Sequence, residues 1–397
     1  MRTSTVRLAC AEGLALVLIG GACGGQANAP RPSASPTAAS PSPTPIPTDL
    51  LVVVSPKSVT APVEMTLTMI DIGGHAIATT DFAPPPAPRF SNCGDVLQPA
   101  VRVAAGAAFF ADKTGVVRRL DPDGKISEVA TFHLANSQQY LSYAVSPDGT
   151  QLIGIIVTTP PLINPTPPIP ADIFVAGGRW TLDLQVARAG GATTVALHRD
   201  LGTSFPKPTI ITGWDDRGPT ATLNSVICTQ AALPSLQYTG SQLIHLALDG
   251  AHRDVIGGAG CVPLDGTVLC GQANYLNGPY ALTVRRSNGS ILWSRQTTGV
   301  AILGPKLAPD GNSVAWGAVY RKGSSQAASL PGQNPLSVAL LGWAGSGAVV
   351  IARADGQLGL ASVTAPLVFN DLGLTVNGQS IGYLPFTPYL AGTIGFA

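Results

Sequence analysis

A turn dipeptide recurs along this chain and limits the folds open to it. Aspartate–glycine pairs begin at six positions and asparagine–glycine pairs at three more, namely Asp123, Asp148, Asp249, Asp265, Asp310, Asp355, Asn277, Asn288 and Asn377. Both dipeptides accept the positive φ angles that tight β-hairpins need. Short runs rich in valine, isoleucine, leucine and alanine lie between them, for example 151–157 and 348–354. Strand-length apolar runs bounded by turn signals predict an all-β fold.

Two of these turns lie in nearly the same local sequence. Residues 146–154 read SPDGTQLIG, and residues 308–316 read APDGNSVAW. Proline presets φ, aspartate binds the local backbone, and glycine takes the left-handed position. Asp265, Asp310 and Asp355 are each 45 residues apart. A period of that length is typical of a four-stranded propeller blade.

The S-P-D-G turn followed by an apolar strand resembles the WD40-like (TolB-type) β-propeller repeat. Strong matches cover 146–154 and 308–316, and weaker copies extend the resemblance over most of residues 97–397. The resemblance implies a β-propeller of four-stranded blades. In many exported bacterial proteins this domain is a binding module or part of a larger enzyme. The motif encodes a hairpin, so it indicates a fold without indicating a function.

We expect seven blades, with six or eight as the alternatives. The innermost strands would begin near residues 97, 140, 209, 259, 302, 338 and 380. A proline-rich insertion at 158–178 lengthens the second interval. Residues 381–386 and 392–396 read as two inner strands, whereas 65–70 and 75–82 read as two strands without inner partners. Strands from both termini would then share one blade and remove the open edges of the ring.

The first 23 residues read as an export signal. An apolar run from Gly13 to Ala22 follows two arginines and is shorter than the roughly 20 apolar residues of a membrane span. The small residues before Cys23 resemble a bacterial lipoprotein signal, which implies that the Cys23 thiol receives a diacylglyceryl group and becomes the new N-terminus. Gly20 stands where that family usually has leucine. Ordinary secretion with cleavage after Ala29, or an apolar start with no export role, are the alternatives.

Residues 24–49 read as a stalk. Seven of them are proline and none is a large aromatic, so the segment cannot bury enough apolar surface to fold. Proline favours an extended helix of about 3.1 Å per residue, which gives a reach of roughly 80 Å. We expect a disordered spacer between the lipid anchor and a propeller domain at 50–397.

Four cysteines remain in the body of the chain: Cys93, Cys228, Cys261 and Cys270. An even number in an exported protein favours disulfides. If a two-residue turn joins Leu264 to Thr267, Cys261 and Cys270 lie directly opposite each other, near disulfide distance. Cys93 and Cys228 would then pair by elimination. The spacings include no C-x-x-C, so we expect no metal site.

Composition disfavours several classes of function. Charged residues make up only 11% of the chain, and 23 basic residues nearly balance 22 acidic ones, so no nucleic-acid footprint is present. Neither H-E-x-x-H nor G-x-S-x-G occurs, and only Glu64 and Glu128 remain beyond the signal. Zinc hydrolases, serine hydrolases and paired-glutamate glycosidases are therefore disfavoured. We assign no catalytic residue, metal or cofactor.

The densest polar and aromatic cluster, Trp214, Asp215, Asp216 and Arg217, supplies our candidate binding residues. Packing between blades is the alternative role for the tryptophan. The sequence favours an extracytoplasmic, lipid-anchored monomer whose propeller binds or scaffolds a protein or cell-envelope ligand. A propeller enzyme, such as a metal-dependent lactonase or a quinoprotein-like dehydrogenase, is the alternative. Such an enzyme needs carboxylates and amides that converge on an ion in the central channel.

Overall fold

A computed structural model describes the chain over several ranges. These are residues 49–58, 64–85, 100–135, 139–160, 162–163, 175–176, 178–203, 209–223, 242–258, 261–264, 267–272, 280–286, 290–297, 306–315, 318–330, 338–353, 355–363, 369–375 and 388–395. The chain divides into two compact units, Met1–Pro45 and Ile46–Ala397, and the described residues all belong to the second. The export signal with Cys23, and the stalk up to residue 48, lie outside the described residues.

The described residues form seven four-stranded antiparallel sheets and one two-stranded sheet. In hydrogen-bonded order, the first four are β30 (Tyr389–Ile394), β1 (Leu50–Pro56), β2 (Met65–Asp71), β3 (Ala76–Phe82); β4 (Val101–Ala104), β5 (Ala107–Ala111), β6 (Val116–Leu120), β7 (Ile126–Thr131); β8 (Gln139–Val145), β9 (Gln151–Thr158), β12 (Trp180–Arg188), β13 (Thr194–Gly202); and β14 (Ile210–Asp215), β15 (Gly218–Leu223), β16 (Gln242–Leu246), β17 (His252–Gly258).

The other three are β18 (Cys261–Leu264), β19 (Thr267–Gln272), β20 (Tyr280–Arg286), β21 (Ile291–Thr297); β22 (Lys306–Leu307), β23 (Ser313–Ala315), β24 (Ala318–Arg321), β25 (Ala328–Ser329); and β26 (Val338–Ala344), β27 (Ala348–Arg353), β28 (Gln357–Ser362), β29 (Phe369–Thr375). The two-stranded sheet pairs β10 (Leu162–Ile163) with β11 (Val175–Ala176).

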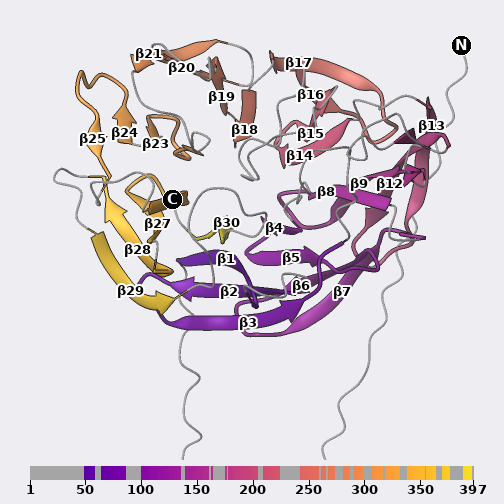
Figure 1. Ribbon diagram of the computed structural model, residues 1–397, viewed down its shortest axis with the longest axis horizontal. Helices are drawn as coiled ribbons and strands as arrows, with labels where there is room; N and C mark the ends of the chain where they lie inside the picture. Colours follow the sequence, from indigo (N-terminus) through magenta and orange to yellow (C-terminus); the bar gives the residue numbers. More distant parts are fainter. Residues whose placement is uncertain are drawn as a thin grey trace, which may run out of the picture. The chain divides into compact units, whose positions relative to one another are not determined.

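The four-stranded sheets follow one another around a ring (Figure 1). The first strands of successive sheets contact each other: β4 contacts β8, β8 contacts β14, and β14 contacts β18. In the same way β22 contacts β26, β26 contacts β30, and β30 contacts β4. Sheets that radiate from a ring of inner strands define a β-propeller. The predicted all-β propeller of four-stranded blades is therefore confirmed.

Both ends of the described chain contribute to one sheet. β30 pairs with β1 in an antiparallel register in which Leu51 lies opposite Thr393. Figure 1 shows the yellow β30 beside the indigo β1. The sheet thus combines three N-terminal strands with one C-terminal strand, whereas the sequence predicted two from each end. β1 was the strand that sequence analysis missed, and the inner strand predicted at 381–386 lies outside the described residues.

Burial changes from the inside of a sheet to its outside. Every residue of β1 is buried, because β1 lies between two strands and both of its faces are covered. β13 is an outer strand with partners on one side only, and most of its residues are exposed. The sequence follows this difference: β1 is a continuous apolar run, and β13 mixes valine and leucine with arginine, aspartate and histidine.

The repeated Pro-Asp-Gly motif forms the turn between the first two strands of a sheet. In the β8–β9 turn the Gly149 amide donates to the Ser146 carbonyl at 2.8 Å, and the Asp148 carboxylate accepts from the Thr150 amide at 3.0 Å. Gly149 has a φ of 73°, which favours glycine. The β22–β23 turn repeats these bonds: Gly311 donates to the Ala308 carbonyl, and Asn312 donates to Asp310. The hairpin interpretation is confirmed for both copies.

One detail of the predicted blade pattern was wrong. Asp355 lies in the turn between β27 and β28, the second and third strands of their sheet, so the 45-residue spacing does not mark equivalent turns. In the sixth sheet, the segment after Tyr320 supplies the outer strand, the two-residue β25. The proline-rich insertion lies between β9 and β12, and only its β10 and β11 pairing and its ends are described.

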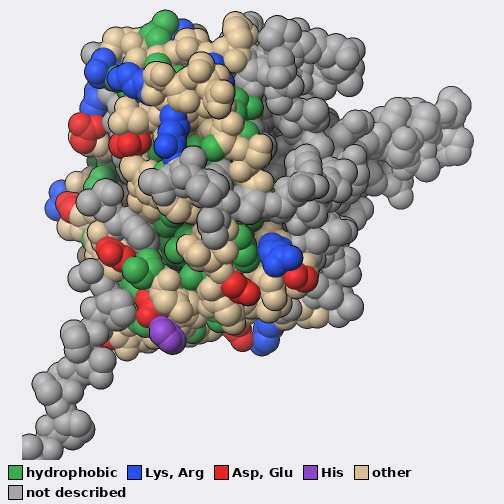
Figure 2. Space-filling model, turned by 90° about the vertical axis from the view of Figure 1, so that its left-hand side faces the viewer, with side chains coloured by type: hydrophobic (Ala, Val, Ile, Leu, Met, Phe, Trp, Pro, Cys, Tyr) green, Lys and Arg blue, Asp and Glu red, His purple; other side chains and the backbone are tan. Residues whose placement is uncertain are grey.

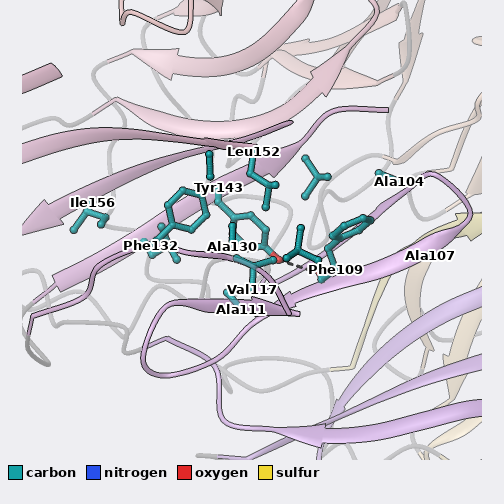
Figure 3. Close-up of a cluster of buried hydrophobic side chains, with 14 residues drawn as sticks. Ala104, Ala107, Phe109, Ala111, Val117, Ala130, Phe132, Tyr143, Leu152 and Ile156 are labelled. Carbon is teal, nitrogen blue, oxygen red and sulfur yellow. Dashed lines mark hydrogen bonds between the residues drawn. The ribbon is translucent and has the colours of Figure 1, made fainter. Parts of the chain in front are cut away.

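Aromatic side chains join the second and third sheets. Figure 3 shows Tyr143 of β8 between Phe109 of β5 and Phe132, which follows β7. The Tyr143 hydroxyl lies 3.0 Å from the Phe109 carbonyl and 2.8 Å from the Ala100 carbonyl. Hydrogen bonding by this hydroxyl therefore connects the third sheet to the second. Gly154 makes room for the Phe132 ring, since a Cβ there would lie 2.7 Å from it. Close packing of this kind holds neighbouring sheets together.

Candidate functional site

The cluster predicted at 214–217 lies at the end of β14 and in the turn that follows. Asp215 accepts a hydrogen bond from the Arg217 amide at 2.9 Å, which fixes the turn. Trp214 is partly buried and packs against a core cluster that includes Ile210 and Ile244. Asp216 is exposed. The structure therefore separates the four residues, because Asp215 and Arg217 belong to one network while Trp214 belongs to the core.

That network centres on His245 of β16, whose side chain is only 1% exposed. Its Nε2 lies 2.8 Å from a carboxylate oxygen of Asp215, and its Nδ1 lies 3.2 Å from Asp254 of β17. The Arg217 guanidinium donates to Asp254 at 2.7 Å. We call these four residues, Asp215, Arg217, His245 and Asp254, the His245 bridge.

Strand register explains how distant residues reach the His245 bridge. His245 lies opposite Asp254 on one side and opposite Thr220 of β15 on the other. Asp215 lies opposite Gly218, two residues from Thr220 and hence on the same face of the sheet. The sequence pattern indicated Asp215 and Arg217 but not His245 or Asp254. The sequence of β16, QLIHL, offers the signal that could have found His245, because it places a histidine within an apolar run.

The side chains of the His245 bridge are suited to hold β14, β16 and β17 together. A neutral imidazole has one N–H, so the ring donates to both carboxylates only when it is protonated. The Arg217 guanidinium supplies a permanent positive charge beside Asp254. Among the described residues, no group of three or more histidine, cysteine, aspartate or glutamate side chains has an arrangement that could hold a metal ion.

A cavity of about 390 Å³ opens between the first two sheets. We call it the Phe82–Phe110 cavity, after two rings whose centroids are 5.2 Å apart with planes at 53°. β3 and the residue after it supply one wall, and β5, the β5–β6 turn, β6 and β7 supply the other. The lining residues are Thr80, Asp81, Phe82, Ala83, Phe110, Asp112, Lys113, Thr114, Arg118 and Ile126. Sequence analysis did not identify this site, since its walls lie in different sheets.

Both carboxylates of the cavity already accept hydrogen bonds. Asp81 accepts from the Thr66 hydroxyl at 2.7 Å and lies 3.0 Å from the Lys57 ammonium. These bonds hold the pKa of Asp81 below its ordinary value, with the Thr66 bond as the largest cause. Asp81 is therefore ionised at neutral pH and has donors around it.

Asp112 is held even more firmly, in the turn from β5 to β6. It accepts from the Thr114 hydroxyl at 2.6 Å and the Thr114 amide at 2.8 Å, and it pairs with Arg118. Burial disfavours the charged form, but the bonds from Thr114 and Arg118 outweigh burial and hold the pKa of Asp112 below its ordinary value. Neither carboxylate is placed as a free proton acceptor.

Charge on the surface is sparse and mixed. On the face shown in Figure 2, acidic and basic side chains are both present, some of them side by side, and much of the remaining surface is apolar or uncharged. The formal net charge of the chain is +1. Within the described ranges, no helix has the length and apolar character that a membrane crossing requires.

The structure describes only one of the two predicted cysteine pairs. The register of β18 and β19 sets Cys261 directly opposite Cys270 and Leu264 opposite Thr267, which is the arrangement expected from the two-residue turn. Cys93 and Cys228 lie outside the described residues. The two disulfides themselves stay predictions.

No known protein-family model matches the sequence, and no curated protein matches it. Among solved structures, an oligogalacturonate lyase in complex with manganese is 10% identical, over 75% of this chain and 81% of that chain, with a TM-score of 0.43. A putative TolB from Agrobacterium tumefaciens is 12% identical, over 83% and 91%, with a TM-score of 0.35. Sqt1 from Saccharomyces cerevisiae is 12% identical, over 84% and 87%, with a TM-score of 0.41. Because these similarities are weak, they do not support the propeller assignment. That assignment depends on strand pairing and on contacts between sheets.

Proposed function

We propose that this chain is an exported, lipid-anchored binding protein. In this proposal Cys23 carries the lipid, residues 24–49 form a spacer, and the propeller binds a ligand at the cell surface as a monomer. We also propose that each four-stranded sheet is one blade, which gives a ring of seven. Nucleic acid has no part in this function.

The observation that carries the binding role is the Phe82–Phe110 cavity. Its volume of about 390 Å³ is in the range of small-molecule sites. Its walls combine apolar side chains with a few polar ones, as such sites do. A general base needs a proton acceptor within reach of a substrate. Asp81 and Asp112 are both occupied by donors from the protein, which favours binding over proton transfer.

The anchor is tested by fractionation of cells that express the full chain. We expect the wild-type protein in the membrane fraction and the Cys23→Ala variant in the soluble fraction, because the lipid is attached through the Cys23 thiol. Cys10→Ala is the matched control, since it removes a cysteine from the same segment and leaves Cys23 in place. A multiple-acyl anchor holds a protein stably on a bilayer.

Two outcomes would overturn the anchor. One is membrane partitioning of Cys23→Ala equal to that of the wild type. The other is release of Cys10→Ala to the same extent as Cys23→Ala.

A further inference from the structure

The Phe82–Phe110 cavity has an apolar part and a polar part, and each limits what can bind. The two phenylalanines are buried, with exposures of 7% and 2%. Ile126 of β7 also lines the cavity and is 44% exposed, which leaves apolar surface open to water. A ligand that covers this surface gains about 25 cal/mol for each Å² that it removes from water. The ligand therefore has an apolar body.

The acceptors of the cavity are already used. Asp112 accepts from Thr114, Val116 and Arg118, and Asp81 accepts from Thr66 and Lys57. A cationic ligand would compete with these internal donors for the same oxygens. The cavity thus offers little to an ammonium or to a metal ion.

The donors, in contrast, are partly unused. Lys113 is exposed at the cavity wall and has no hydrogen-bond or ion-pair partner among the described residues. Arg118 has five N–H groups, and its contacts with Asp112 and Glu128 use two of them. Its side chain is 30% exposed, so a ligand in the cavity can reach part of it.

We infer that the Phe82–Phe110 cavity binds an organic carboxylate. The carboxylate lies against Lys113 and Arg118, and the apolar body covers Ile126 beside the largely buried rings of Phe82 and Phe110. Hydrogen bonds between these cations and a carboxylate are stronger than hydrogen bonds between neutral groups. A single negative charge is favoured over a phosphate dianion, because Asp81 and Asp112 repel added charge. This inference rests on the proposed binding function and names the class of its ligand.

Phenylacetate and phenylacetamide are the probes, since they differ in charge and share one apolar body. We titrate each into the full-length protein in detergent micelles and follow binding by saturation-transfer NMR, with protein-free micelles as a blank. Phenylacetate should bind about tenfold more tightly than phenylacetamide, which is the worth of one charged hydrogen bond. Lys113→Gln should lose this preference.

Lys125→Gln is the matched control, because Lys125 is an exposed lysine in the turn from β6 to β7 and does not line the cavity. Its preference for phenylacetate should equal that of the wild type. Equal binding of the two probes, equal effects of the two lysine variants, or no binding of phenylacetate would each overturn the inference. None of these results affects the partitioning of Cys23→Ala between membrane and soluble fractions. The ligand inference can therefore fail while the lipid anchor holds, and the anchor can fail while the ligand inference holds.

Discussion

His245 is a polar side chain buried in the fourth sheet. Its ring is buried between two carboxylates, one of which, Asp215, is itself only 10% exposed. Without the imidazole between them the two carboxylates repel each other, and Asp215 loses its partner at low solvent exposure. Removing one partner of a buried ionic network is far more costly than removing a surface pair.

We predict that His245→Leu lowers the free energy of unfolding by about 3 kcal/mol. His198→Leu is the control, because His198 pairs with Asp183 at 2.6 Å but is 61% exposed, and it should cost less than about 1 kcal/mol. Urea denaturation followed by fluorescence measures both. Equal losses in the two variants would contradict the role of the His245 bridge.

Acid should weaken the β5–β6 turn through Asp112. The folded pKa of Asp112 lies below the unfolded value of about 3.9. Its bonds therefore stabilise the fold at neutral pH, and this stabilisation is lost as the pH falls below about 4 towards the folded pKa. Thermal melts of the wild type and of Asp112→Asn should differ clearly at pH 7 and converge below pH 4. A difference that stays constant between these pH values would contradict this account.

Sequence reasoning at the residue scale found half of the His245 bridge. Asp215 and Arg217 stood out because they are close together in the chain beside a tryptophan. His245 and Asp254 come from later strands, and only strand register brings them to Asp215. The Phe82–Phe110 cavity was missed for the same reason, since its shape depends on how two separate sheets pack. Short-range patterns do not contain that information.

The turns and strands were more predictable than the sites. Pro-Asp-Gly turns have a local cause, namely the φ preferences of proline and glycine and the hydrogen bonds of aspartate. Six of the seven predicted inner strands begin within a few residues of the observed ones: β4, β8, β14, β18, β22 and β26. The seventh was predicted near residue 380, which lies outside the described residues, and the described inner strand of that sheet is β30. β30 pairs with β1. Sequence patterns did not indicate β1, because it is an apolar run without an adjacent turn dipeptide.

The β18–β19 hairpin supports a specific covalent prediction. Its register sets Cys261 opposite Cys270, and opposed positions on paired strands lie within disulfide reach. We predict that peptide mapping without reductant recovers both cysteines in one cross-linked fragment of the exported protein. Alkylation of both thiols before any reduction would contradict the bridge. Cys93 and Cys228 provide the comparison, because their pairing rests on elimination alone.

At the scale of the whole propeller, closure links the two ends of the described chain. β1 begins at Leu50, directly after the proposed stalk, and its partner β30 ends at Ile394. The tether would then join the same sheet that closes the ring. Closure also leaves β30 with neighbours on both sides, since it contacts both β4 and β26. Closure of this kind leaves only short inner edges, which neighbouring sheets protect.

The pairing of β1 with β30 is the central claim, because the ring and the proposed tether both depend on it. The most direct test introduces cysteines at Leu51 and Thr393, which lie opposite each other. Mass spectrometry of an unreduced digest should find these positions joined. The control pair, Leu51→Cys with Tyr389→Cys, should stay unlinked, since Tyr389 lies opposite Val54 and too far from Leu51 for a disulfide. A link in the control alone, or in neither variant, would contradict the closed ring.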